Sequence, residues 1–152
     1  MKTLLTILIL TSIISAKTTT YCGPDSVICS YEQMYDRFIE LSPTYPNKKA
    51  LIFRMLESVA TGPFFLSQAK YVNSIDIDSG DGVLFFHPIS SVEETKVLED
   101  TKSMKLVRRV VIEVYGGSIE GVPVESKIAY IYTIVKDDTG SWKISKVKQD
   151  AI

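Results

Sequence analysis

The side chain best suited to acid–base chemistry in this sequence is its single histidine, His87. Imidazole has an unperturbed pKa of about 6.5, so it exchanges a proton near neutral pH without a special environment. His87 stands directly before Pro88 at the end of an apolar run, and the sequence places no carboxylate beside it. We therefore keep His87 as the one catalytic candidate, with a surface or structural role as the alternative.

An acidic run, residues 76–82, could supply the oxygen ligands of a calcium loop. Counted from Asp76, the fifth position is Gly80, the sixth is Asp81 where glycine is needed, and the twelfth is His87 instead of a bidentate glutamate. These mismatches favour an acidic hairpin turn. One histidine and two cysteines are also too few for a zinc site, so we predict no metal and no other cofactor.

The two cysteines, Cys22 and Cys29, enclose six residues. In an oxidising compartment such a pair most simply forms a disulfide, which would fix the N-terminal lead to the first helix. The small loop would contribute about 2–3 kcal/mol. A redox-active pair needs the closer Cys-x-x-Cys spacing, which is absent.

The first sixteen residues predict a cleaved secretory signal peptide. Lys2 precedes an apolar run over residues 4–14, which ends at Ser15 and Ala16. That run is too short to span a hydrocarbon core of about 30 Å. We therefore expect residues 1–16 to be a signal peptide, residues 17–29 a lead with the disulfide loop, and residues 30–152 one secreted, extracellular domain.

The charge balance limits the partners of this domain. The formal net charge is −1, and no basic stripe is present. Nucleic acid and anionic membrane surfaces are therefore excluded as expected partners.

Two amphipathic segments predict helices. The first reaches residue 41 from Ser30 or from an earlier start at Asp25 or Ser26, and Glu32 falls on its polar face. The second runs from Pro46 or Asn47 to about residue 60 and stops at Gly62 and Pro63.

The remaining chain predicts mainly strands. Three segments rich in β-branched and aromatic residues fill residues 104–148 and favour consecutive antiparallel strands, with a tight turn at Asp137, Asp138 and Gly140. Residues 65–77 and 82–88 also read as strands. The stretch from Ser90 or Ser91 to Leu98 fits either a short helix or a charged connector.

Side-chain alternation within the predicted sheet suggests a ligand cavity. Tyr130, Tyr132 and Ile134 share one strand face, and Trp142 begins the last strand. These four residues are our candidates for lining a cavity, with an ordinary sheet-on-helix core as the alternative.

Arg108 and Arg109 point to opposite faces of their strand and cannot form a basic patch.

The order of elements resembles the nuclear-transport-factor-2-like fold, in which a curved sheet wraps helices into a cone. Residues 128–135, the Gly-Ser-Trp-Lys-Ile segment at residues 140–144, and the helical pattern from Tyr31 to Leu41 carry this resemblance. It implies an α+β domain with two N-terminal helices on a curved antiparallel sheet of about four to six strands. Cystatins have a related architecture, but their Gln-x-Val-x-Gly inhibitory hairpin is missing here.

Three functions follow from these observations. The first is non-enzymatic binding of an apolar small molecule or a protein partner. The second is an enzyme that transfers protons or dehydrates a substrate in the cone, with His87 or an aspartate as base. The third is a homodimeric structural or interaction module that pairs through an open sheet.

Overall fold

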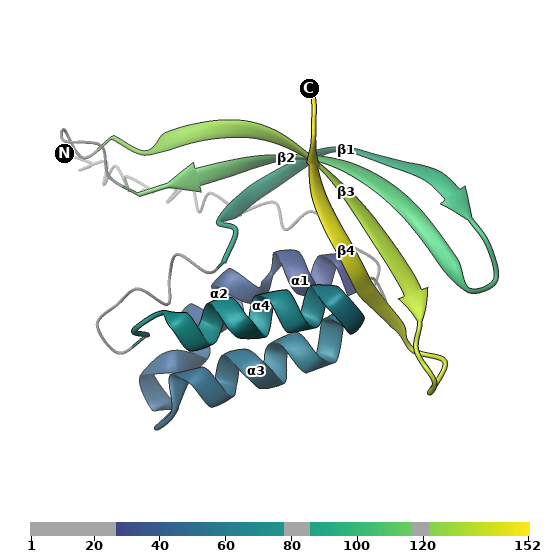
Figure 1. The fold of residues 1–152 in the computed structure, drawn as a ribbon. Coiled ribbons are helices and arrows are strands. Elements are labelled where there is room, and N and C mark those ends of the chain that lie inside the picture. The colour runs from purple at the N-terminus through teal and green to yellow at the C-terminus, as the bar shows by residue number, and fades with distance from the viewer. Residues whose placement is uncertain (1–26, 78–85, 117–121) are drawn as a thin grey trace, which may run out of the picture.

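The computed structural model describes residues 27–77, 86–116 and 122–152 (Figure 1). These residues form an α+β fold in which helices lie under one face of a curved antiparallel sheet. The sheet has four strands in the order β1-β2-β3-β4. They are β1 Ile89–Asp100, β2 Met104–Tyr115, β3 Val124–Lys136 and β4 Trp142–Asp150.

The first predicted helix occurs as two consecutive helices. These are α1 Val27–Glu32 and α2 Met34–Leu41, which meet at Gln33. The backbone continues almost unbroken between them, since the Gln33 N–H donates to the Cys29 carbonyl at 2.9 Å. A short 3-10 helix, Ser42–Thr44, follows.

The second predicted helix is confirmed as α3 Lys48–Val59. It begins at Asn47, whose side-chain oxygen accepts a hydrogen bond from the Ala50 N–H at 3.0 Å. This contact satisfies one of the amide groups that have no partner within the first helical turn.

Loss of this cap gives a small, local prediction. We expect Asn47→Ala to lower the free energy of unfolding by about 1 kcal/mol, because one N–H of the first turn loses its acceptor. Urea denaturation measures the change, and Asn73→Ala, at an exposed position in another helix, serves as the matched control. Equal losses in the two variants would contradict the capping role.

The predicted strand over residues 65–77 is wrong, because these residues belong mainly to helix α4 Gly62–Ser74. Gly62 and Pro63, which we interpreted as the stop of the previous helix, begin the next one. Gly62 takes a φ of 54°, which glycine adopts without strain, and Pro63 occupies the first turn. Phe64 and Val72 are buried and eight residues apart, the spacing of one helix face.

The expected short helix or connector after Ser90 is also wrong, since residues 89–100 form strand β1. Its polar residues reflect its place at the sheet edge, where most of its side chains are exposed. The strand expected over residues 82–88 is not seen where the chain is described: Phe86, His87 and Pro88 are not in a strand, and residues 82–85 lie outside the described ranges.

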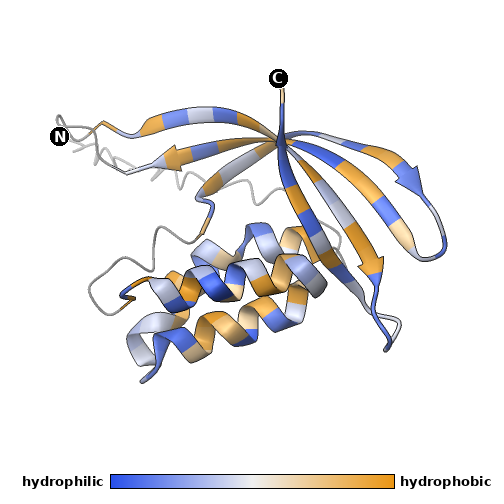
Figure 2. Cartoon of the chain, in the orientation of Figure 1, coloured by the Kyte–Doolittle hydropathy of each residue, from blue (hydrophilic) through white to orange (hydrophobic). Residues whose placement is uncertain are grey.

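The three C-terminal strands are confirmed as β2, β3 and β4. Asp137 makes the last turn by accepting hydrogen bonds from the N–H groups of Thr139 and Ser141, both at 2.9 Å. Gly140 takes a φ of 81° there. Figure 2 shows hydrophobic and hydrophilic residues alternating along these strands.

The core lies between the sheet and the helices. It includes Ile52 and Leu56 of α3, Val72 of α4, and Ile144 of β4, all fully buried. The covered face of β2 is the one that carries Arg109 and Glu113, and not the more uniformly apolar face with Leu106 and Ile112. No helix in the described part of the chain is both long and apolar enough to cross a membrane.

Candidate functional site

A buried carboxylate, Glu113, gathers the first group of polar side chains under the sheet. Glu113 is 0% exposed. Its Oε1 lies 2.9 Å from His87 Nδ1 and accepts a hydrogen bond from the Tyr130 hydroxyl at 2.7 Å. The Tyr115 hydroxyl donates to Oε2. The carboxylate that the sequence could not place beside His87 therefore comes from strand β2.

A buried ion pair, Glu32 with Arg109, forms the second group. Arg109 Nε donates to Glu32 Oε1 at 3.0 Å, and its Nη2 donates to Oε2 at 2.5 Å. The Tyr132 hydroxyl also donates to Glu32 Oε1, at 3.1 Å, and Arg109 Nη1 donates to the Thr95 hydroxyl at 3.0 Å. Since the guanidinium meets both carboxylate oxygens, Glu32 has the contacts of an ionised group.

Aromatic rings join the two groups into one layer, which is buried except at His87 and Tyr115. The Tyr130 and Tyr132 ring centroids are 6.2 Å apart, and the Tyr130 ring lies 5.2 Å from that of His87. Tyr31 of α1 packs against Tyr132 at 6.2 Å and against His87 at 6.1 Å. This layer fixes α1 against the middle of the sheet.

The pKa values follow from these contacts. Burial raises the pKa of Glu113, but hydrogen bonds from His87, Tyr115 and Tyr130 together outweigh it, so the pKa falls below its ordinary value of 4.5. Burial raises the pKa of Glu32, and Arg109 opposes that rise. Burial and the neighbouring Glu113 raise the pKa of Tyr115 to about 12.

The polar layer is complete without a ligand. Among the described residues, every buried side-chain nitrogen or oxygen has a hydrogen-bond partner. A buried site that awaits a substrate usually leaves some polar atoms to water or to the substrate. None of these buried groups therefore needs a ligand to complete its hydrogen bonds.

An open cavity lies beside this layer, between the two N-terminal helices and the first strand. We call it the α2–β1 cavity, and its volume is about 580 Å³. Its helix wall is formed by Glu32, Gln33, Tyr35, Asp36, Arg37 and Glu40, with Cys29 at one end. Its strand wall is formed by residues 88–92 and Val114.

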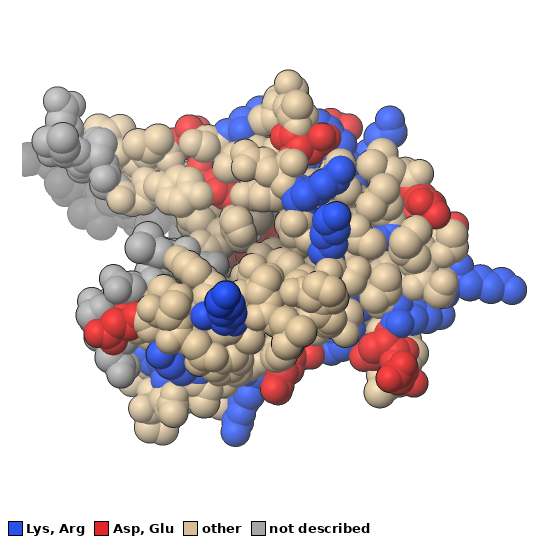
Figure 3. Space-filling view, viewed as in Figure 1, with Lys and Arg blue, Asp and Glu red and all other residues tan. Residues whose placement is uncertain are grey.

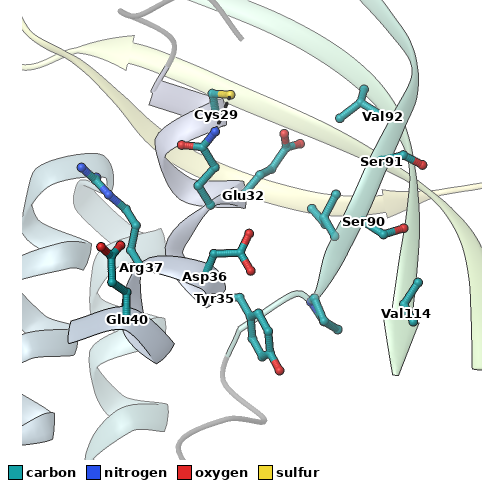
Figure 4. A pocket seen from close by; sticks show the side chains of 13 residues that line it. Cys29, Glu32, Tyr35, Asp36, Arg37, Glu40, Ser90, Ser91, Val92 and Val114 are labelled. Carbon is teal, nitrogen blue, oxygen red and sulfur yellow. Dashed lines mark hydrogen bonds between the residues drawn. The ribbon is translucent and has the colours of Figure 1, made fainter. Parts of the chain in front are cut away.

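The two walls differ in chemistry (Figure 4). Asp36 points from α2 toward the strand, while Val92 points back toward the helices. Cys29 accepts a hydrogen bond from the Gln33 side chain, with 3.8 Å between Nε2 and Sγ. Glu32 belongs to both the cavity wall and the buried ion pair, so the cavity and the polar layer share a residue.

A second cavity of about 410 Å³ lies where α4 meets β4, and Phe64, Ser67 and Val147 are among its lining residues. Figure 3 shows the surface hollowed where the sheet parts from the helices, with acidic and basic side chains scattered around the hollow.

The sequence-predicted ligand residues do not line either cavity. Tyr132 and Ile134 are buried in the core, and Tyr130 belongs to the Glu113 group. Trp142 is partly buried and packs against the core, and the Nζ atoms of Lys105 and Lys136 are 5.2 and 5.1 Å from its ring centroid. Three of these four side chains therefore belong to the core, and Trp142 packs at its edge.

The predicted disulfide is not tested, because Cys22 lies outside the described residues. Cys29 is buried in α1. Asp76 follows the end of α4, and most of the acidic run after it lies outside the described ranges. Within those ranges, no three histidine, cysteine, aspartate or glutamate side chains are placed to hold a metal ion.

Comparisons with known proteins give little. No protein-family model matches the chain, and no curated protein matches it. A solved structure with a related arrangement is the crystal structure of the intermembrane space region of chloroplast protein ARC6. The two chains are 12% identical in sequence, and the superposition has a TM-score of 0.48. It covers 83% of this chain and 92% of the ARC6 chain. We draw no functional conclusion from this likeness.

Proposed function

We propose that this chain is a secreted, non-enzymatic binding domain with a nuclear-transport-factor-2-like cone, and that its ligand is a protein partner held in the α2–β1 cavity. Secretion rests on the signal-like residues 1–16, which lie outside the described ranges. The cone rests on the helices under one face of a curved sheet.

The observation that carries the binding function is an open cavity beside a polar layer whose hydrogen bonds are complete. Buried polar atoms of the described residues already have hydrogen-bond partners, so none of them is left to bind a substrate. The cavity, in contrast, has a polar helix wall and a strand wall with apolar side chains. A mixed lining suits a protein segment better than an apolar small molecule.

A peptide-display selection against the folded domain tests this function. We expect selected peptides to shift the amide resonances of Asp36, Arg37 and Ser91. We also expect Asp36→Trp, which fills the cavity from an exposed helix position, to abolish binding. Ser67→Trp, in the second cavity, is the matched control and should bind normally. Peptides that bind Asp36→Trp as well as the parent protein would refute the proposal.

One observation favours a second candidate, proton transfer at His87. The ring nitrogen Nδ1 faces the buried Glu113, so an Nδ1–H donated to this carboxylate would leave Nε2 as a base. The side chain of His87 is 35% exposed. The Tyr130 hydroxyl lies 3.1 Å from His87 Nδ1 and would help to orient the imidazole ring.

Access to Nε2 decides this candidate. Because the chain has one histidine, the absorbance of carbethoxylated imidazole after treatment with diethyl pyrocarbonate reports on His87 alone. A working base should react at about the rate of free imidazole at neutral pH. The contrary result is a carbethoxylation rate at least about tenfold lower in the folded protein than in urea-unfolded protein. In that case His87 is structural and proton transfer is excluded.

The homodimer remains a further alternative. The sheet face away from the helices carries ion pairs, with Arg108 Nε at 2.9 Å from Asp150 and Lys127 Nζ at 2.5 Å from Glu93. Solution mass tests dimerisation, and a monomer at high concentration removes it.

A further inference from the structure

We propose that the partner is captured as an extended, basic peptide segment that adds as a strand beside β1 and places one side chain in the α2–β1 cavity. This inference rests on the proposed function and specifies its ligand. Four features of the described residues lead to it.

The first feature is the open edge of β1. The sheet ends at β1 on one side and at β4 on the other. The β4 edge is partly covered, since Ala60 bridges Ile144 and the Thr61 N–H donates to the Ile144 carbonyl at 2.9 Å. Within the described ranges, β1 pairs only with β2. Its outward backbone groups are therefore available to an added strand.

The second feature is exposed apolar surface on this edge. Val97 is 55% exposed and Leu98 is 43% exposed. Edge strands usually protect themselves with charged side chains, so two adjacent exposed apolar residues are unusual there. A strand lying beside β1 would cover them.

The third feature is the continuity of edge and cavity. The first residues of β1, including Ile89 and Val92, also form the strand wall of the cavity. A segment that lies along β1 therefore passes the cavity, and every second side chain of that segment faces the helices. Asp36 points from the helix wall toward β1 (Figure 4), so we expect one such side chain to approach it.

The fourth feature is charge. On the cavity's helix wall Glu32 is neutralised by Arg109. The remaining charged side chains there are Asp36, Glu40 and Arg37, so the wall has an acidic excess. Strand β1 itself has one lysine and four acidic residues, namely Glu93, Glu94, Glu99 and Asp100. Three of these acids contact Lys127, Arg108 and Lys105, which leaves Glu99 against Lys96 on the strand. The acidic surplus of this surface therefore lies on the helix wall, at Asp36 and Glu40. A lysine or arginine side chain in the partner complements this surface.

Irregularities in the β1–β2 pairing limit the length of the added strand. The register shifts between Ile89 and Ser91, between Val92 and Glu94, and between Val97 and Glu99. Such bulges twist an edge and prevent long regular pairing. They are compatible with a short peptide and oppose open-ended sheet association between copies of the domain.

The probe is a fluorescein-labelled octapeptide of alternating valine and lysine, titrated with the folded domain by fluorescence anisotropy. We expect it to bind at least about tenfold more tightly than its valine–glutamate counterpart, because the helix wall of the cavity has an excess of acidic side chains. Methylation of alternate peptide nitrogens should weaken binding about tenfold, because it removes strand hydrogen bonds without changing charge.

Protein variants test the two halves of the surface. We expect about tenfold weaker binding for Leu98→Lys on the edge and for Asp36→Asn combined with Glu40→Gln in the cavity. The matched controls are Leu66→Lys, at a residue 67% exposed on α4, and Glu57→Gln on α3. Both controls should bind as the parent protein does.

The outcomes separate the two proposals. If N-methylation and Leu98→Lys have no effect while Asp36→Trp abolishes binding, the cavity binds its ligand but strand addition is wrong. If Asp36→Trp has no effect, the cavity function itself is wrong. Equal binding of the lysine and glutamate peptides, or binding of neither, overturns the basic-strand inference.

Discussion

Replacing Arg109 with leucine is expected to lower the free energy of unfolding by about 3–5 kcal/mol. The variant would leave the Glu32 carboxylate, whose side chain is 4% exposed, without its cation. The Tyr132 hydroxyl alone cannot replace two charge-assisted hydrogen bonds. Urea denaturation at neutral pH, followed by circular dichroism, measures the loss.

The double variant Glu32→Leu with Arg109→Leu is the control. It removes both charges, so no buried charge remains unpaired, and apolar replacement of a buried ion pair is often neutral. We therefore expect the double variant to recover most of the stability that Arg109→Leu loses. Two results would contradict this role. Either the double variant is less stable than the single one, or the single variant loses under about 1 kcal/mol in the free energy of unfolding. In both cases the ion pair does not stabilise the packing of α1 on the sheet.

Local sequence patterns were sufficient for the parts of the fold with strong periodicity. Helix α3 and strands β2, β3 and β4 all follow from apolar spacing and turn residues such as Asn47 and Gly140. Strand β1 was missed because an edge strand exposed on both faces lacks the alternation that a half-buried strand shows. Helix α4 was missed because Gly62 and Pro63 serve as both an end and a start.

The polar layer could not be predicted for a different reason. Glu32 was assigned to the polar face of an amphipathic helix, yet it is buried against Arg109, which is 77 residues away in the sequence. Glu113 and His87 are 26 residues apart and on different elements. Such residues come together only when α1 and the segment before β1 pack against the sheet. The one available signal was the charged residues Arg109 and Glu113 on an otherwise apolar strand face, which already required buried partners.

The two polar groups explain why α1 lies where it does. Glu32 and Tyr31, adjacent at the end of α1, contact both the ion pair and the aromatic rings of β3. The helix wall of the α2–β1 cavity begins at the same point. The shape of the cavity therefore depends on the buried layer, and variants that disturb the layer should weaken ligand binding even where they do not touch the ligand.

Replacing Glu113 with leucine should have the second large effect, a loss of about 3 kcal/mol in the free energy of unfolding. Leucine is similar in size but accepts no hydrogen bond, so the Tyr130 hydroxyl and His87 lose a partner inside the protein. Glu113→Gln keeps one acceptor oxygen and the same shape, and we expect it to lose only about 1 kcal/mol. Urea denaturation at neutral pH compares the two.

The pH dependence of Glu113→Gln tests the same contacts independently. Because the folded protein lowers the pKa of Glu113 below 4.5, the ionised carboxylate stabilises the fold above that pH, and this contribution is lost as the pH falls toward the folded pKa. The glutamine variant does not titrate at this position, so its stability should fall less steeply on acidification. The stability difference between parent and variant should therefore shrink below about pH 4.5. A difference that stays constant or grows with acidification would mean that Glu113 is not held as an ion by His87, Tyr115 and Tyr130.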